Sequence, residues 1–197
     1  MKTSINFKAA KSDSEIHNFR KKSFDYIRKD LTHKNEYWME QKIADRLLKI
    51  EAYCKEKSGR KLQKNAMPVR EAVVVIKENT TMQDLHNLSK RLEEELKIRI
   101  FQIAIHKDEG HYDKDTNEWK PNYHAHLVAD WQDLETGKTL KHQSFHYSKM
   151  QDLAAECLEM ERGVSGSLTR LEAVVFKIKK KEEDLKILEE RYSQLQK

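Results

Sequence analysis

Three histidines lie where two predicted strands can bring metal-ligating side chains together. His124 and His126 flank Ala125 in a His-Ala-His segment. Alternate side chains of a strand point to the same face, so these two rings emerge about 7 Å apart. His106 ends the preceding apolar strand, and an antiparallel pairing places its ring beside that pair. Three imidazoles on rigid strands can hold a divalent ion with coordination positions left open, as a catalytic metal requires.

Two acidic residues directly after His106 extend this candidate site. Asp108 and Glu109 can supply an oxygen ligand or orient a ligand imidazole. His111 is a further possible ligand, although we expect it to be exposed in a hairpin over residues 107–122. The opposing interpretation is that histidines are common on protein surfaces, and nine in 197 residues is not an extreme number. Two histidines at alternate positions, with a third that ends an apolar strand, favour a metal site over this opposing interpretation.

The strands and helices that would position these residues follow from hydrophobic periodicity. Alternating or β-branched runs predict strands over residues 4–9, 71–77, 99–106 and 123–131. Helical spacing of apolar residues predicts helices over residues 13–28, 36–56, 81–97 and 148–162. Elements in this order indicate an α/β sandwich, in which helices flank an antiparallel sheet.

Charge is unevenly distributed along the chain, although the formal net charge is only +5. The first 70 residues hold 18 Lys and Arg against 9 Asp and Glu, and the remainder holds 20 against 24. A polyanion partner is therefore expected for the N-terminal third. The alternative is a helix-rich surface with a local basic excess that binds nothing.

Composition argues against several other classes of protein. Charged residues make up 36% of the chain and there are only five Gly and two Pro, which disfavours an all-β sandwich. No apolar run is long enough to span a membrane, and the first 15 residues lack the apolar core of a signal peptide. Cys54 and Cys157 match no metal or redox spacing, so we expect reduced thiols in a cytoplasmic protein.

The C-terminal residues follow a separate pattern. Mostly apolar residues recur there at alternating spacings of three and four, at Leu171, Val174, Ile178, Lys181, Leu185, Leu188, Tyr192 and Leu195. This heptad pattern predicts a coiled-coil-like helix. We therefore expect residues 166–197 to begin a C-terminal helical extension through which two copies form a homodimer. The alternative is a single amphipathic helix packed against the preceding domain.

Several short motifs resemble those of one known family. Residues 17–20 (HNFR) resemble an HNxR element, and Asn35 with Tyr37 resembles an Asn–Tyr pair. Residues 106–109 (HKDE) with residues 124–126 (HAH) resemble an H-x-D-E…H-x-H metal motif, and the segment 158–163 (LEMERG) resembles the one that follows it. Together these motifs resemble the MobV (Pre/Mob) plasmid mobilisation relaxases, of the HUH endonuclease superfamily, over roughly residues 1–165.

The chain departs from this family between the two parts of the metal motif. Additional residues separate them, and residues 121–123 (PNY) stand where the family has Thr-Pro. A longer hairpin between the same two strands leaves the histidine positions intact. The chain after Glu109, however, must follow a different path.

The resemblance implies an activity and roles for individual residues. It implies an HUH relaxase domain over residues 1–165 that nicks and rejoins one DNA strand at a plasmid or transposon origin of transfer, by covalent attachment to the 5′ phosphate. The nucleophile would be His17, with Arg20 and Glu109 as further catalytic residues. The three strand histidines would hold Mn²⁺ or Mg²⁺, with Zn²⁺ as an alternative. The partners would be single-stranded or hairpin origin-of-transfer DNA and the conjugative transfer machinery of a bacterial cytoplasm.

Basic and aromatic residues of the N-terminal third would contact that DNA. Lysines neutralise phosphates, while aromatic rings stack on unpaired bases. A basic loop over residues 55–64 is predicted to contribute. The individual residues predicted to bind DNA are Lys21, Lys22, Arg28, Lys29, Lys34, Asn35, Tyr37 and Trp38.

Residue spacing alone leaves the nucleophile open. His17 and Arg20 can be ordinary exposed helix residues, and Tyr26 and Tyr37 are rival nucleophiles in the same basic third. A tyrosine nucleophile would indicate an HUH rolling-circle replication initiator. Histidines that are structural, or that bind zinc without turnover, would indicate a non-catalytic DNA-binding and dimerisation protein. An unrelated metallohydrolase is a further alternative.

Overall fold

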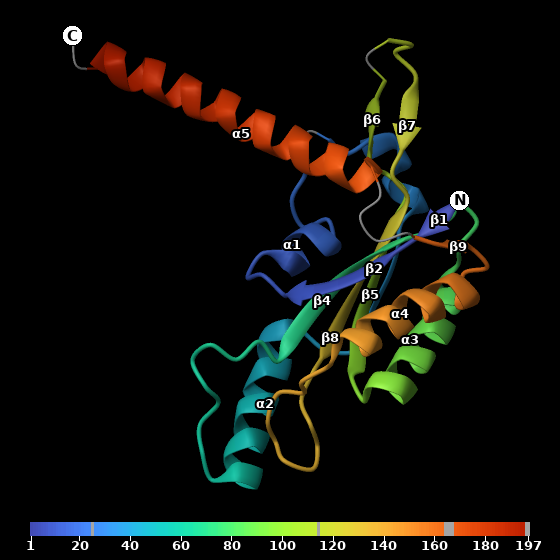
Figure 1. The fold of residues 1–197 in the computed structure, drawn as a ribbon, viewed down its shortest axis with the longest axis vertical. Helices are drawn as coiled ribbons and strands as arrows, with labels where there is room; N and C mark the ends of the chain where they lie inside the picture. Colours follow the sequence, from blue (N-terminus) through green and yellow to red (C-terminus); the bar gives the residue numbers. More distant parts are fainter. Residues whose placement is uncertain (25, 114, 164–167, 196–197) are drawn as a thin grey trace. The chain divides into compact units, whose positions relative to one another are not determined.

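The computed structural model describes residues 1–24, 26–113, 115–163 and 168–195. The chain divides into two units, Met1–Arg162 and Gly163–Lys197 (Figure 1). The predicted boundary between residues 165 and 166 lies outside the described residues, so the extent of each domain stays a prediction.

A five-stranded antiparallel sheet forms the centre of the first unit. Its strands, in spatial order, are β2 (Ile5–Ala9), β4 (Val69–Val75), β8 (His124–Asp130), β5 (Arg99–His106) and β3 (Glu36–Met39). Nearly every residue of β5 and all of β8 are buried, because both strands lie inside the sheet. Adjacent strands pair antiparallel throughout. The predicted antiparallel sheet with flanking helices is confirmed.

Alternation along β8 sends successive side chains to opposite faces of the sheet. Leu127 belongs to a large apolar cluster with α3 (Met82–Leu96) and α4 (Ser144–Cys157). Val128 belongs to a smaller cluster on the opposite face, with Ile50 of α2 (Ile43–Ser58). His126 has the same parity as Val128, so it also points away from the main core. The strand therefore presents its histidines on the face opposite α3 and α4, the same face against which α2 packs.

Small paired strands complete the first unit. β1 (Lys2–Thr3) pairs parallel with β9 (Glu161–Arg162). β6 (Gly110–Tyr112) pairs antiparallel with β7 (Trp119–Pro121), which confirms the hairpin expected within residues 107–122. A 3₁₀ helix, η1, spans Lys29–Lys34.

The first predicted helix, over residues 13–28, is wrong for most of its length. Among the described residues of this range, only α1 (Ser14–Asn18) is α-helical. Arg20 has a φ of 49°, in the left-handed region that ends a right-handed helix. Its guanidinium binds Asp108 and Glu109, so polar contacts from another part of the chain outweigh the helical periodicity.

Two further helix boundaries differ from the prediction. Residues 36–39 form β3 rather than the start of a helix, because they pair with residues Gln102–Ile105 of β5 and complete the sheet. The helix predicted over residues 148–162 instead spans Ser144–Cys157. Glu159 has a φ of 48°, and the chain then turns into β9. Local apolar spacing could not report either strand pairing.

The second unit is a single helix, α5 (Leu168–Leu195). Several residues of the predicted heptad seam have exposed side chains, including Ile178, Leu185 and Leu188. The coiled coil and the homodimer stay predictions. Among the described helices, none has both the length and the hydrophobicity that a membrane span requires.

Candidate metal centre

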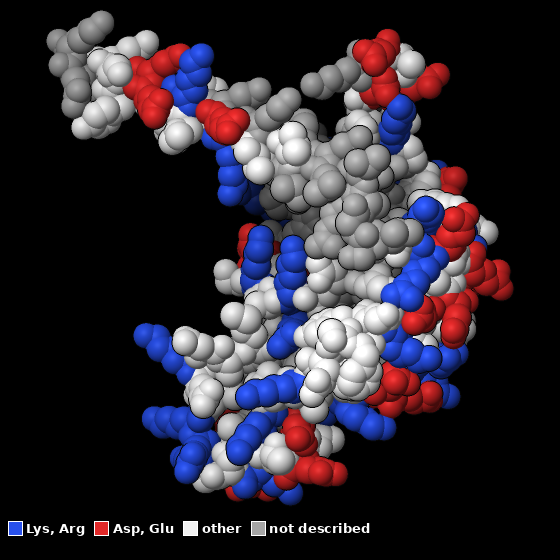
Figure 2. Space-filling model, viewed as in Figure 1, with Lys and Arg blue, Asp and Glu red and all other residues white. Residues whose placement is uncertain are grey.

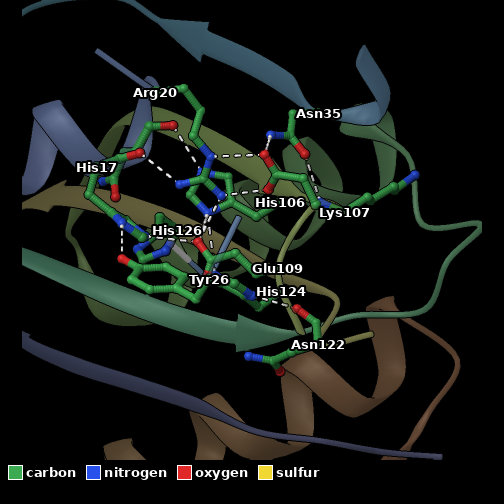
Figure 3. Close-up of polar contacts among 12 residues, drawn as sticks. His17, Arg20, Tyr26, Asn35, His106, Lys107, Glu109, Asn122, His124 and His126 are labelled. Atoms are coloured by element: carbon green, nitrogen blue, oxygen red, sulfur yellow. Dashed lines mark hydrogen bonds and ion pairs between the residues drawn. The ribbon is translucent and has the colours of Figure 1, made fainter. Parts of the chain in front are cut away.

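The strand ends bring the three predicted metal-ligating histidines together. His106 and His124 are direct partners in the β5–β8 register, and His126 pairs with Ala104 on the same face. All three are buried, with at most 7% of their surface exposed. His17 of α1 joins them: one nitrogen from each of the four rings lies within 4.8 Å of the others (Figure 3).

Backbone carbonyls fix the ring protons of two of these histidines. His106 Nε2 lies 2.9 Å from the carbonyl oxygen of Asn18, and His124 Nδ1 lies 2.7 Å from that of Asn122. A carbonyl only accepts, so these nitrogens donate. The remaining nitrogens, His106 Nδ1 and His124 Nε2, then face each other with lone pairs at 3.3 Å. Two opposed lone pairs repel unless a cation lies between them.

His126 has the same arrangement with a carboxylate as its acceptor. Its Nδ1 donates to Glu71 Oε1 at 2.6 Å. Its Nε2 is buried and has no hydrogen-bond partner among the described residues. Asn18 Nδ2 donates to the same carboxylate at 2.8 Å, and Ser14 Oγ also donates to it. A carboxylate that holds a ligand imidazole through its second nitrogen is the usual support of a metal site.

Electrostatics keep these rings neutral. Burial lowers the pKa of His106, His124 and His126 below its usual value. Burial alone would raise the pKa of Glu71, but the hydrogen bonds that it accepts from His126, Ser14 and Asn18 lower that pKa to about 2. Neutral imidazoles beside an ionised carboxylate are the protonation states that bind a divalent cation. The residues present therefore fit a metal ion.

His17 lies at the edge of this cluster, and each of its ring nitrogens contacts a polar side chain. Its Nε2 lies 3.3 Å from Glu109 Oε1, and its Nδ1 lies 3.3 Å from the Tyr26 hydroxyl. Burial lowers the pKa of His17 to about 4, although the negative charge of Glu109 acts in the opposite direction. The ring is therefore uncharged near neutral pH, and it can serve as a fourth ligand or as a nucleophile.

Glu109 touches both His17 and the predicted ligands. Its carboxylate lies 3.4 Å from His106 Nδ1 and 3.7 Å from His124 Nε2, and it accepts from Arg20 Nη2 at 2.7 Å. Burial alone would raise the pKa of Glu109, but its contact with His106 and the nearby positive charge of Arg20 lower that pKa to about 2. The side chain is thus an ionised proton acceptor within reach of His17.

Asp108 holds Arg20 and does not contact the histidine cluster. It is fully buried, and Arg20 donates to both of its oxygens, at 2.6 and 3.1 Å. Thr32 and Asn35 donate to the same carboxylate at 3.0 and 2.7 Å. Asp108 therefore orients Arg20 toward Glu109. It does not take the role of an oxygen ligand, which the sequence analysis had left possible.

The residues predicted to bind DNA have different surroundings. Asn35 contacts Asp108 and the backbone N–H of Lys107, and it donates to the Tyr37 hydroxyl at 3.1 Å. Trp38 is partly buried against the main core and lies edge-on to His86, with ring centroids 5.0 Å apart.

The predicted DNA-binding cations lie nearer the surface. Arg28 pairs with Asp30 at 2.5 Å and lies over the Trp119 ring. The lysines of the predicted set are exposed, and they are Lys21, Lys22, Lys29 and Lys34.

The basic loop over residues 55–64 does not reach the metal centre. Its residues form the end of α2 and the lining of a separate pocket with residues 133–141. That pocket lies near the first residues of β4, whereas the histidines lie near the last residues of this strand. The expected role of this loop at the site is therefore wrong, because the strand length separates the two regions.

Three supporting residues of the site were not expected from the sequence. They are Ser14, Asn18 and Glu71, which form the hydrogen-bonded group behind His126. Glu71 lies two residues from Val73, the cross-strand partner of His126, so only the strand register reveals it. Asn18 lies inside the HNFR segment, and that motif was the one available signal.

A cavity of about 440 Å³ opens beside the cluster. Its lining includes His17 and His126, the aromatic rings of Phe24 and Tyr26, and lysines of β2 and the following turn. Phe24 and Tyr26 stack with ring centroids 5.5 Å apart. The space beside the metal centre is therefore both aromatic and basic.

Comparison with known proteins supports the fold. No family model matches the sequence, and no curated protein matches it. Crystal structures of the MobM relaxase domain (MOBV; Mob_Pre), bound to plasmid pMV158 oriT DNA and Mn, are similar to the chain. One has a TM-score of 0.61 and 16% identity, over 85% of this chain and 93% of that one. Another, with a 22-nucleotide DNA carrying a 3′ thiophosphate, has a TM-score of 0.61 and 15% identity over the same shares.

A third structure of that domain, with a 23-nucleotide DNA, has a TM-score of 0.54 and 14% identity, over 85% of this chain and 92% of that one. At such low sequence identity the structural likeness shows the fold alone, and function has to be argued from the site. The chain therefore has a relaxase-like fold of the MobV type.

Proposed function

We propose that this chain is a metal-dependent DNA relaxase that nicks and rejoins one strand at a plasmid or transposon origin of transfer. The observation that carries the proposal is the convergence of three strand histidines, each with a free lone pair, beside a neutral His17. The relaxase-like fold and the oriT DNA bound by the similar MobM structures support the same activity.

His106, His124 and His126 would hold a divalent ion through His106 Nδ1 and the Nε2 atoms of the other two. When bound, the ion would withdraw charge from the oxygens of the scissile phosphate. The similar crystal structures contain Mn, which supports Mn²⁺, with Mg²⁺ and Zn²⁺ as alternatives.

His17 would attack the scissile phosphorus with a neutral ring nitrogen. A phosphorus–nitrogen bond forms to the 5′ phosphate, the bond to the 3′ oxygen breaks, and that oxygen leaves with the proton that the imidazole releases and Glu109 passes on. The imidazole proton passes to the Glu109 carboxylate, which lies 3.3 Å from His17 Nε2. The reverse reaction rejoins the strand.

Arg20 would keep Glu109 in place and add positive charge near the reacting phosphate, since it already binds that carboxylate at 2.7 Å. The exposed lysines named above would neutralise the backbone of a single strand or hairpin. Asn35, Tyr37, Trp38 and Arg28 complete the proposed DNA-binding set. Contact with the transfer machinery, a bacterial cytoplasmic location and dimerisation through α5 belong to the same proposal.

A tyrosine nucleophile, as in a rolling-circle initiator, is the second candidate. The Tyr26 hydroxyl lies 3.3 Å from His17 Nδ1, so a second nucleophilic atom is present in the site. In that case His17 would act as the base that accepts the tyrosine proton.

The test is the covalent protein–DNA adduct formed with single-stranded origin DNA and Mn²⁺. We expect His17→Ala to abolish the adduct, whereas Tyr26→Phe and Tyr37→Phe retain it. A phosphoramidate is lost in mild acid and a phosphotyrosine is not, so acid treatment of the wild-type adduct gives an independent readout. An acid-stable adduct that disappears only in a tyrosine variant would assign the nucleophile to tyrosine. Wild-type protein that binds Mn²⁺ but forms no adduct would contradict the relaxase proposal.

A further inference from the structure

His17 repeats the ring arrangement of the three strand histidines. Each strand histidine has one ring nitrogen on an oxygen acceptor, and its other nitrogen is left to face the cluster. His17 Nδ1 lies 3.3 Å from the Tyr26 hydroxyl. Its Nε2 lies 3.3 Å from Glu109 Oε1, and that oxygen lies 3.4 Å from His106 Nδ1. When Nδ1 donates to Tyr26, the lone pair of Nε2 therefore faces the cluster.

The four rings together form a complete ligand set for a tetrahedral ion. One nitrogen from each ring lies within 4.8 Å of the others. In a tetrahedral site with zinc–nitrogen distances of about 2.0–2.1 Å, neighbouring nitrogens lie about 3.3 Å apart. His106 Nδ1 and His124 Nε2 already have a separation of 3.3 Å. His17 lies on a helix of five residues and its side chain is 24% exposed, so its ring has room to move toward the buried three.

The preferred coordination number distinguishes Zn²⁺ from Mn²⁺ and Mg²⁺ at such a site. Zn²⁺ takes four ligands and binds imidazole well, so four histidines leave it no open position. Mn²⁺ and Mg²⁺ prefer six ligands with oxygen donors, so three histidines leave positions for water or phosphate oxygens. We propose that His17 is the fourth ligand of a Zn²⁺ ion in the DNA-free protein, and that Zn²⁺ thereby holds the site closed. The ligand set is argued from geometry, while the inhibitory role rests on the proposed function.

Ligation of His17 removes both features that the proposed reaction needs from this ring. A nitrogen whose lone pair is held by an ion cannot attack phosphorus. In that state Nε2 carries no proton, so the proton transfer from His17 to Glu109 is lost as well. The zinc-bound protein is therefore expected to be inactive although every side chain of the site is present.

Access to the site does not limit an incoming phosphate. Lys8 and Lys11 line the cavity beside His17, and Figure 2 shows Lys and Arg side chains over the region of α1 and β2. Positive charge at this opening attracts an anion. Whether the anion reaches the ion is therefore decided by an open coordination position, which the six-coordinate ions retain.

Glu109 is the rival fourth ligand, because its carboxylate contacts the same rings. However, its Oε1 already accepts from Arg20 Nη2 at 2.7 Å. A carboxylate oxygen also suits Mn²⁺, whereas imidazole suits Zn²⁺. The two assignments therefore predict different metal affinities for variants of His17 and Glu109.

The test measures the Zn²⁺ and Mn²⁺ affinities of the DNA-free full chain, by chelator competition for Zn²⁺ and by titration calorimetry for Mn²⁺. The variants are His17→Ala, Glu109→Gln and a control, His33→Ala, which removes an exposed histidine of η1. We expect His17→Ala to weaken Zn²⁺ binding about a hundredfold and Mn²⁺ binding less than about threefold. Retained Mn²⁺ binding also shows that this variant is folded. The control should match the wild type for both ions.

An added anion gives a second readout, with Co²⁺ in place of Zn²⁺. Azide binds an ion only where a coordination position is open. We expect azide to change the visible spectrum of the Co²⁺-loaded His17→Ala protein and to leave that of the wild type unchanged.

Native Zn²⁺ affinity in His17→Ala, or equal losses for the two ions, would overturn the proposal. Loss of Zn²⁺ affinity in Glu109→Gln alone would assign the fourth position to that carboxylate. For the inhibitory role, we expect one equivalent of Zn²⁺ to abolish the covalent adduct that the wild type forms with Mn²⁺. An adduct that forms equally fast with Zn²⁺ would contradict a closed site. No adduct with either ion would refute the relaxase proposal, and the affinities would still decide the ligand set.

Discussion

Each strand histidine of the proposed metal centre donates one ring proton to an oxygen acceptor, and that acceptor determines which nitrogen keeps the lone pair that could bind an ion. For His106 and His124 the acceptors are backbone carbonyls, and for His126 the acceptor is Glu71. A carboxylate differs from a carbonyl because its charge raises the basicity of the ring it holds. Glu71 is therefore the residue through which the metal affinity can be changed without removing a ligand.

Glu71→Gln removes this charge and keeps the shape of the side chain. We expect the affinity for Mn²⁺ to fall about tenfold to a hundredfold, because His126 becomes a weaker donor and its tautomer is less firmly fixed. Titration calorimetry of the purified protein measures this. Glu78→Gln, an exposed change after the same strand, should leave the affinity unchanged. A Glu71→Gln protein with native Mn²⁺ affinity would show that the carboxylate only fills space.

Among the elements, the β6–β7 hairpin controls more of the site than its sequence suggests. Its base fixes Glu109, whose carbonyl oxygen accepts from the Asn122 N–H at 2.8 Å. The carbonyl of Asn122 in turn accepts from His124 Nδ1. Ile27 forms a bridge to Glu109 from the opposite side. The hairpin therefore couples a proposed proton acceptor to a proposed metal ligand.

Gly110→Ala should disturb this hairpin. A Cβ at Gly110 would lie 2.4 Å from the backbone oxygen of Lys120 and 2.6 Å from the Trp119 ring, so the strands must separate. We expect a loss of about 1–3 kcal/mol in the free energy of unfolding, together with weaker Mn²⁺ binding. Urea denaturation and metal titration measure the two effects. Loss of stability with native metal affinity would show that the hairpin does not position His124.

Elements were predicted well where the tertiary contacts agree with the local pattern. The 99–106 strand and the 81–97 helix match β5 and α3 because their apolar residues face the main core at the expected period. The prediction of a helix over residues 13–28 was wrong because Arg20 binds the carboxylates of Asp108 and Glu109, which lie far along the chain. Residues 36–39 became a strand because the edge of β5 was available for pairing.

In the whole molecule, four histidines and two carboxylates lie together at one buried or half-buried site, and the two kinds of group have opposite preferences for protons. Burial lowers the pKa of His106, His124 and His126, and that of His17 to about 4. An unfolded histidine takes up a proton near pH 6.5, but these folded ones do not. The metal-free protein should therefore be fully stabilised above pH 6.5 and lose stability as the pH falls toward 4.

This pH dependence is measured by urea denaturation of the metal-free protein between pH 7.5 and 4.5. We expect the free energy of unfolding to decrease with falling pH, by at most about 1.4 kcal/mol per pH unit for each such histidine. Glu71 and Glu109, with pKa values of about 2, add a loss only below pH 4.5. His126→Leu should reduce the slope between pH 6.5 and 5, because that variant has no imidazole to protonate in the unfolded state. An unchanged slope in that variant would contradict the inferred protonation states.

The sequence by itself determined the three strand histidines, the antiparallel strands that carry them and the basic character of the first third. These follow from residue type and period, which are local properties. Only the tertiary structure decided that His17 joins the cluster, that Glu71 holds His126, and that the 55–64 loop lies at the other end of the sheet. Those contacts depend on strand register, strand length and the point at which α1 ends. Each joins residues far apart along the chain, and no local pattern encodes such a distance.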